Sequence, residues 1–429
     1  MLWLKTNCNL FEINIPNMNQ GNAEAVTQNK KFNAVHVGIS GFPFGSAAIN
    51  KCLAVYESLI PYNVDFLIIN NRAVHGKNIP VPLKKAGTIN RMKYVYTSYS
   101  PYRSDSFLTR NFSQVWGRIR EFCLLVDLGR TRSIDFMFYY PTNGSFFELL
   151  MYRAVSKTFG IRLIAHYVEF RTAFVEDINA FDQLKHRLYD KYFMRFVDAV
   201  LPISEFLIRQ LESRHYHGRY LKVPPLTDFN QFKIDAPPAQ EKFFLYVGSA
   251  AYLNAIEFIT RAFDETLDSD FYLYLVVNGS TEHMIAVEKT IRGLRKRDYV
   301  KTFSKLKYST LIEMYRQAKA LLIPLTSNIT DVARFPQKIS EYLASENPVI
   351  TTRNGEIPYY FTDMQNALVA EEYAPQAFAL KMDLVVTSPT VAAEIGRRGY
   401  ETGRKFFDLH SYGEELKQLL VELDSGQIK

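Results

Sequence analysis

The stretch of sequence best suited to chemistry is 331–358, which reads DVARFPQKISEYLASENPVITTRNGEIP. Pro336 suits the first turn of a helix, where a missing N–H costs nothing, and the free amides of such a turn attract anions. Lys338 and Glu341 would then share one helix face near that end. The alternative is that the two residues form only an ordinary ion pair on a helix surface. A cation with free amides can hold a diphosphate, and a carboxylate can accept hydrogen bonds from ribose hydroxyls. The segment therefore predicts a nucleoside diphosphate site.

The loop at 39–46, ISGFPFGS, is a second candidate because it lies between a strand-like run and a helix-like one. Gly41 and Gly45 permit a close backbone approach to a ligand, with Ser46 beside them, unless they only form turns. The loop lacks the G-x-G-x-x-G spacing, so it does not predict a dinucleotide site.

The segment 165–171, AHYVEFR, directly follows another strand-like run. His166 or Glu169 could position or deprotonate an acceptor hydroxyl group there. The alternatives are that His166 is a buried histidine with satisfied hydrogen bonds, and that Glu169 pairs with Arg171.

An alternation of strand-like and helix-like segments must position these candidates. In the first half, β-branched and aromatic runs recur at 32–37, 64–69, 134–140, 161–165 and 199–202, with amphipathic segments at 47–59 and 146–158. In the second half, the runs lie at 243–247, 271–277, 300–303, 320–324, 349–351 and 367–369, with helix-like segments at 255–266, 281–294, 309–318 and 337–344. This pattern predicts an α/β protein with two consecutive doubly wound domains, whose ligands bind beyond the carboxyl ends of the strands.

A proline-rich connector separates the two halves, since Pro224, Pro225, Pro237 and Pro238 cluster there. We expect an N-terminal extension at 1–30, an N-terminal domain at 31–222, a linker at 223–240, a C-terminal domain at 241–408, and a last helix at 409–429 that could return to the N-terminal domain.

The run at 331–358 resembles the donor-binding segment of GT-B glycosyltransferases of the family 4 group: an aromatic residue, Pro, any residue, Lys, then Glu-Tyr-Leu-Ala and Pro-Val. The segments 196–207, 243–263 and 308–324 resemble other parts of that family. The resemblance implies the GT-B fold, in which two Rossmann-like domains face each other across a cleft. It also implies a retaining reaction on a nucleotide sugar, without a metal or other cofactor.

By this resemblance, Glu341 binds the ribose of the donor and Lys338 lies near its diphosphate. Gly248 and Ser249, in the loop after the first strand of the second domain, are expected beside the donor. By the same resemblance, the loop with Gly41 faces the cleft in which donor and acceptor meet.

The sequence also departs from the family pattern. Ala333 stands where members often carry a glutamate, and the loop after Gly248 lacks their Arg and Lys. We expect Arg334, four residues before Lys338 and so on the same helix face, to supply the missing charge; the alternative is a solvated surface charge.

The turn that contains Gly355 and Glu356 follows a strand-like run in the second half. Because ligands bind beyond strand ends, we expect Glu356 to contact the donor sugar, with Gly355 forming the tight turn. The alternative is that Glu356 accepts hydrogen bonds only from turn amides.

Composition narrows the class of protein. The 429 residues include 51 Lys and Arg against 44 Asp and Glu, and the net charge of +7 is too small to indicate a nucleic acid partner. Cys8, Cys52 and Cys123 have no metal-binding spacing and indicate a reducing compartment. Because 1–20 lacks the features of a signal peptide and no apolar run could span a bilayer, we expect a cytoplasmic protein.

The segment 103–132 mixes arginines with phenylalanines and a tryptophan, so it could lie on an anionic membrane. The favoured alternative is an amphipathic helix whose apolar face packs on its own domain.

We therefore expect an enzyme that moves a sugar from a nucleoside diphosphate sugar to a hydroxyl acceptor, as in polysaccharide or glycan assembly. One alternative is a catalytically silent GT-B relative that acts as a partner subunit. Another is a nucleotide-sugar isomerase or phosphorylase on the same fold.

Overall fold

The computed structural model describes residues 30–44, 47–76, 82–142, 146–173, 179–235, 237 and 239–426. Gly45, Ser46 and nearly all of the expected extension at 1–30 lie outside the described residues. No helix in the described part of the chain is both long enough and apolar enough to cross a membrane.

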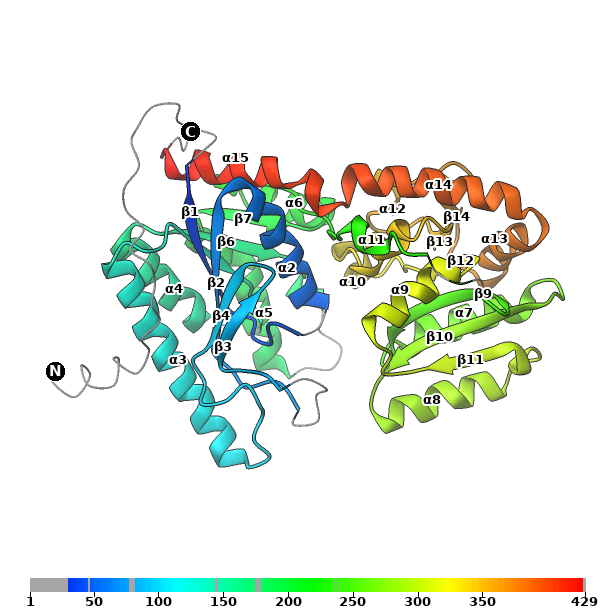
Figure 1. Cartoon of the computed structure of the whole chain (residues 1–429), viewed down its shortest axis with the longest axis horizontal. Coiled ribbons are helices and arrows are strands. Elements are labelled where there is room, and N and C mark those ends of the chain that lie inside the picture. Colours follow the sequence, from blue (N-terminus) through cyan, green and yellow to red (C-terminus); the bar gives the residue numbers. More distant parts are fainter. Residues whose placement is uncertain are drawn as a thin grey trace.

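The first domain is built on an eight-stranded sheet with the order β3-β4-β2-β1-β5-β6-β7-β8 (Figure 1). Its strands are β1 (Phe32–Val37), β2 (Val64–Asn70), β3 (Ala86–Ile89), β4 (Met92–Tyr96), β5 (Phe136–Tyr139), β6 (Arg162–Tyr167), β7 (Ala199–Pro202) and β8 (Arg219–Tyr220). The helices are α2 (Ala47–Leu59), α3 (Phe107–Arg130), α4 (Phe146–Phe159), α5 (Ala180–Tyr192) and α6 (Glu205–Glu212). All pairs are parallel except β3 with β4.

The second domain has a parallel six-stranded sheet with the order β11-β10-β9-β12-β13-β14. Its strands are β9 (Lys242–Ser249), β10 (Phe271–Asn278), β11 (Val300–Phe303), β12 (Ala320–Ile323), β13 (Val349–Thr352) and β14 (Leu368–Ala370). The helices are α7 (Leu253–Glu265), α8 (Thr281–Arg292), α9 (Tyr308–Gln317), α10 (Ile329–Ala333), α11 (Lys338–Ala344), α12 (Ile357–Tyr360), α13 (Pro375–Thr387) and α14 (Pro389–Phe406).

Each sheet contains one point at which the strand order reverses. In the first domain the chain builds outward from β1 to β2 and then resumes on the other side of β1 with β5. In the second domain it builds from β9 to β10 and β11, then resumes on the other side of β9 with β12. Loops diverge at such switch points and leave a crevice at the carboxyl ends of the strands. A ligand site is therefore expected after β1 and β5, and after β9 and β12.

The chain passes between the domains twice. The linker forms the first crossing, into the second domain. The second crossing follows α14, where a short 3-10 helix leads back to α15 (Gly413–Asp424), which packs on α2 of the first domain (Figure 1). Gly413 permits this approach, since a Cβ there would lie 2.2 Å from the carbonyl oxygen of Ser58. Lys417 donates to the carbonyl of Lys30, and Lys30 pairs with Asp424 at 2.5 Å.

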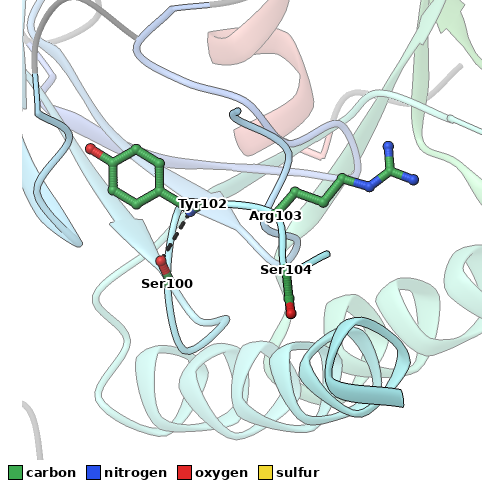
Figure 2. Close-up of a pocket in the computed structure, with 4 residues that line it drawn as sticks. All are labelled: Ser100, Tyr102, Arg103 and Ser104. Atoms are coloured by element: carbon green, nitrogen blue, oxygen red, sulfur yellow. Dashed lines mark hydrogen bonds between the residues drawn. The ribbon is translucent and has the colours of Figure 1, made fainter. Parts of the chain in front are cut away.

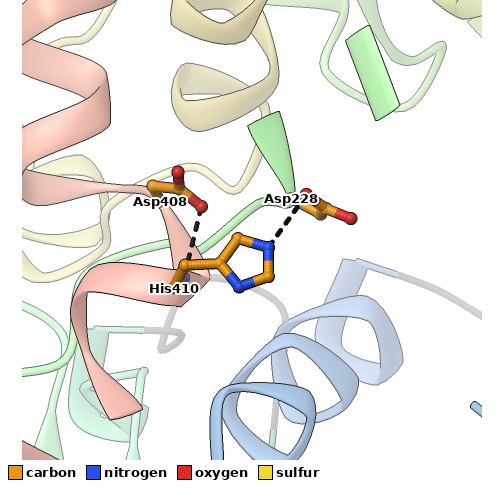
Figure 3. Close-up of side chains that lie close together, drawn as sticks. All are labelled: Asp228, Asp408 and His410. Atoms are coloured by element: carbon orange, nitrogen blue, oxygen red, sulfur yellow. Dashed lines mark hydrogen bonds and ion pairs between the residues drawn. The ribbon is translucent and has the colours of Figure 1, made fainter. Parts of the chain in front are cut away.

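Asp228, Asp408 and His410 come together where the two crossings touch (Figure 3). Thr227 exchanges backbone hydrogen bonds of 2.9 and 3.1 Å with the returning segment, and His410 Nε2 lies 3.3 Å from Asp228 Oδ1. The ligand atoms of the trio lie within 4.8 Å of one another, as in a metal site, but Asp408 already pairs with Arg404. The cluster therefore has a structural role, which is to fasten the two crossings together.

Candidate functional site

The donor edge, defined here as the carboxyl ends of β9 and β12, begins with Gly248 and Ser249. Both residues close β9 and remain partly exposed. A Cβ on Gly248 would lie 2.6 Å from the hydroxyl oxygen of Tyr246, so glycine lets the backbone pass over that ring. The carbonyl of Ser249 accepts from the amide of Tyr252 at 3.1 Å, which turns the chain into α7.

Lys338 reaches this edge from the start of α11. Its Nζ donates to the carbonyl of Val247 at 2.9 Å and lies 4.2 Å from the centre of the Tyr246 ring. Burial lowers the pKa of Lys338 to about 7, although the carboxylates of Asp331 and Glu341 act in the opposite direction. The group therefore gains its charge near neutral pH, and an anion placed beside it would favour the charged form.

Glu341 lies one turn further along α11. It accepts hydrogen bonds from the hydroxyl groups of Tyr315 at 3.0 Å and Tyr308 at 3.5 Å. Burial raises the pKa of Glu341 to about 6, while the two hydroxyl groups and Lys338 act to lower it. Sequence reasoning missed both tyrosines, although they stand seven residues apart and so share one face of α9.

The start of α11 differs from the prediction. The helix begins at Lys338, so Pro336 precedes it and does not lie in its first turn. The amides of Ile339 and Ser340 are not free for an anion, since they donate to the carbonyls of Pro336 and Gln337 at 3.1 and 3.3 Å.

Arg334 has an extended backbone, with ψ of 161°, between α10 and α11. The prediction that it shares a helix face with Lys338 is therefore wrong. Its Nη1 donates to the hydroxyl of Tyr252 at 3.3 Å, which places the guanidinium at the donor edge by another route. Burial raises the pKa of Tyr140 well above its usual value, while Arg334 acts to lower it. Because Tyr140 follows β5, Arg334 also lies near the carboxyl edge of the first sheet.

Glu356 lies at the junction of the domains, with only 1% of the residue exposed. One carboxylate oxygen accepts from the amide of Glu205 at 2.7 Å, and the other lies 2.7 Å from Lys222 Nζ. Although burial opposes its charge, the pKa of Lys222 is raised by its hydrogen bonds to both glutamates. In this conformation Glu356 has no exposed carboxylate to offer a sugar.

Gly355 precedes Glu356 with a φ of +60°, a conformation that favours glycine. A Cβ there would lie 3.0 Å from the carbonyl oxygen of Asp331. Gly355 therefore brings this turn against α10, as the predicted tight turn requires.

His166 is completely buried in a chain of hydrogen bonds. His36 Nε2 lies 3.1 Å from the carbonyl of Ile39, which can only accept, so His36 Nδ1 must accept from Tyr56 at 2.6 Å. Tyr56 in turn accepts from His166 Nε2 at 3.1 Å. Burial lowers the pKa of His36 to about 4 and that of His166 well below its usual value, so both rings are neutral. Nδ1 of His166 has no hydrogen-bond partner among the described residues.

Glu169 is partly exposed, unlike His166, and lies near Tyr140, whose pKa it acts to raise. Arg171 donates to the backbone carbonyls of Pro141 and Thr142. The two predicted acceptor-side residues are neighbours, since both line a cavity of about 10 Å³, but only Glu169 is accessible.

Gly41 lies in the loop after β1, at the switch point of the first sheet. Its φ is +134° and its amide donates to Asn70 Oδ1 at 2.8 Å, which ties the loop to the end of β2. A larger hollow of about 450 Å³ lies on the loop after β4, lined by Ser100, Tyr102, Arg103 and Ser104 (Figure 2). Sequence reasoning did not single out this hollow, because nothing in its polar residues marks it.

The two parallel-sheet domains have the GT-B fold. Residues 228–402 match the family described as "Glycosyl transferases group 1". No curated protein matches the sequence.

Several solved structures share the whole architecture. Sucrose-phosphate synthase from Thermosynechococcus elongatus is 14% identical with a TM-score of 0.71, over 93% of this chain and 100% of that one. HepE from Anabaena, in complex with UDP and glucose, is 13% identical with a TM-score of 0.65, over 91% and 99%. An α,α-trehalose-phosphate synthase (UDP-forming) from Burkholderia xenovorans, in complex with glucose-6-phosphate, is 10% identical with a TM-score of 0.63, over 91% and 100%. At these identities the likeness shows the fold alone.

Proposed function

We propose that this protein transfers a sugar from a nucleoside diphosphate sugar to a hydroxyl group of a glycan or similar acceptor. The observation that carries the proposal is the pair Lys338 and Glu341 on α11, beside the glycine-containing end of β9 and inside the family segment. A structure of similar fold, Anabaena HepE, is in complex with UDP and glucose.

On the donor side, we assign Lys338 and Arg334 to the diphosphate and Glu341 to the ribose. Gly248 and Ser249 let the backbone approach the nucleotide. A guanidinium and an ammonium differ in geometry, so both can contact one diphosphate without competing for the same oxygen atoms. These two cations would stabilise the charge on the leaving nucleoside diphosphate in a reaction that uses no metal.

On the acceptor side, we assign Glu169 to the acceptor hydroxyl, with Gly41 allowing close approach. His166 acts through its packing against Tyr140, whose ring centre lies 5.7 Å from its own. The resemblance to family 4 supports a retaining outcome and a role in polysaccharide or glycan assembly.

The test is calorimetric titration of the full chain with UDP, GDP, ADP and CMP and with their sugars. Glu341→Ala should weaken binding of the preferred nucleotide by about 1.5 to 3 kcal/mol, the scale of a charge-assisted hydrogen bond. Glu313→Ala, which removes a partly exposed carboxylate from α9, is the control. Equal affinities for wild type and a folded Glu341→Ala would exclude the ribose role.

A catalytically silent relative is the second candidate, and one observation favours it. Ala333 replaces the expected glutamate, is buried, and receives at its carbonyl a hydrogen bond of 2.8 Å from Ser204. A silent protein would bind the nucleotide sugar but release no nucleoside diphosphate when incubated with it and a mixture of glycan acceptors.

A further inference from the structure

Three helices of the first domain cover the same face of its sheet. α3, α4 and α5 follow β4, β5 and β6, and each leads to a strand displaced in the same direction along the sheet. Because such crossovers are right-handed, the three helices lie on one side. α3 contacts α4, visible beside it in Figure 1, and the rings of Phe146 and Tyr189 join α4 to α5 with centres 5.5 Å apart.

The outer side of α3 is apolar. Leu108, at 78% exposure, begins a stripe with a spacing of four and three residues that continues through Phe112, Val115, Ile119 and Phe122, all exposed. The opposite side of the helix, with Leu125 and Leu128, packs on the domain. The favoured alternative, that the apolar face of this helix packs on its own domain, is therefore wrong for these side chains.

The next two helices also expose apolar side chains. α4 exposes Phe147 and Leu150, and α5 exposes Phe181, at 76%, with Leu184 and Leu188. We call these ten side chains on three helices the α3–α5 face. Adjacent helices lie about 8 to 10 Å apart, so the face is broader than the single seam through which two helices pair.

Positive charge surrounds the face. The three helices contain nine Lys or Arg residues and five Asp or Glu residues. Three of the five acidic residues, Glu121, Glu148 and Asp190, are buried. Arg118 and Arg153 are paired with Glu148 and Asp198. The exposed charged residues of the three helices are mostly basic: Arg130, Lys157, Arg187 and Lys191, against Asp127. Apolar side chains that enter the bilayer contribute hydrophobic binding energy, and basic side chains near anionic headgroups contribute electrostatic attraction. The two contributions add.

We propose that the α3–α5 face rests on the surface of an anionic lipid bilayer. The area is too wide for one partner helix, and its charge complements anionic lipid. Large connected apolar patches are rare on proteins that remain free in solution. The proposal does not depend on the sugar transfer proposed above, because it concerns the opposite side of these helices from the sheet and none of the donor-edge residues.

The test is flotation of the full chain with vesicles of phosphatidylcholine alone or with 30% phosphatidylglycerol, a composition of roughly the charge density used in such assays. We expect binding to the anionic vesicles, weakened by salt because charge attraction is screened. The variant Leu108→Ser/Phe112→Ser/Phe122→Ser should bind at least about tenfold less, since three apolar side chains no longer enter the bilayer.

The matched control is Ile285→Ser/Leu380→Ser/Val391→Ser, which removes three exposed apolar side chains from the second domain and should bind as wild type does. Arg130→Gln/Arg187→Gln should reduce binding to anionic vesicles only. Thermal stability equal to that of wild type is expected and would show that the variants fold, because every replaced apolar side chain is at least 41% exposed.

Four results would overturn the proposal. Wild type could fail to float with anionic vesicles, or the triple α3 variant could float as well as wild type. A wild-type dimer in light scattering that the triple α3 variant dissociates, without vesicle binding, would assign the face to a second copy. Binding that arises only after deletion of residues 1–29 would assign it to that segment of the chain.

Discussion

The carboxyl edges of the two sheets occupy the same topological position but hold their titratable groups differently. At the donor edge, Lys338 and Glu341 have pKa values of about 7 and 6, so both change charge near neutral pH. At the first sheet, His36 and His166 are buried, neutral and fixed in orientation through Tyr56. Burial shifts the pKa in both places. Lys338 and Glu341 are partly exposed, so a ligand at the donor edge can contact them and reverse the pKa shift. His36 and His166 are completely buried and cannot be contacted in this way.

Tyr56→Phe should show the difference between the two edges most clearly, because it should lower stability without changing nucleotide affinity. It leaves His36 Nδ1 and His166 Nε2 without partners in the core, and each buried orphan costs about 1 to 3 kcal/mol. We expect chemical denaturation to show a loss of roughly 2 to 5 kcal/mol in the free energy of unfolding, with unchanged nucleotide affinity. A large loss of nucleotide affinity in the folded variant would show that the edges are coupled.

The histidine chain should also make stability depend on pH. The pKa of His36 is about 4 in the folded protein and near 6.5 when unfolded, so the unfolded chain takes up the proton first as pH falls. We expect stability to fall between pH 6.5 and 4 by up to about 3 kcal/mol from this group. The measurement is the free energy of unfolding against pH for wild type and His36→Gln, and parallel curves would contradict the assignment.

Lys338→Ala should weaken nucleoside diphosphate binding by about 2 kcal/mol, the scale of a charge-assisted contact. It should not reduce stability comparably, because burial already disfavours the charged form of this lysine. Lys289→Ala, on the exposed side of α8, is the control for loss of a positive charge in the same domain. Equal affinities of the two variants for nucleoside diphosphate in calorimetry would show that Lys338 does not contact the diphosphate.

The affinity for nucleoside diphosphate should decline as pH rises above about 7. A bound diphosphate raises the pKa of Lys338, so the complex holds a proton that the free protein loses, and each pH unit costs up to about tenfold in affinity. Lys338→Arg remains charged over this range and should flatten the profile. A wild-type profile without slope between pH 7 and 9 would contradict the prediction.

Arg334→Ala should have the smallest effect on binding. Its charge matters most as the nucleotide leaves, so turnover should fall about tenfold while nucleotide affinity changes less. The measurement is kcat for transfer alongside calorimetry. Wild-type values in both would show that other groups meet the phosphate charge.

Much of the fold could be read from the pattern of apolar residues. The predicted bounds of 32–37 and 199–202 coincide with β1 and β7, because parallel strands buried on both faces are largely apolar runs. The bounds of 300–303 also coincide with β11, although β11 is a partly exposed edge strand. The pair β3 and β4 was missed, since β3 is a short edge strand, AGTI, that alternates exposed and half-exposed residues. β8 has only two residues and no pattern of its own.

The sequence by itself determined the βαβ alternation and the spacing of Lys338 and Glu341, because both depend on contacts within one helix or strand. Only the tertiary structure decided what surrounds each charge: the Tyr246 ring under Lys338, the hydroxyl groups of α9 on Glu341, and the Tyr252 hydroxyl at Arg334. It also buried Glu356 against Lys222 and His166 against Tyr56. These partners come from segments far apart in the chain, and whether a carboxylate or imidazole is exposed depends on all of them together.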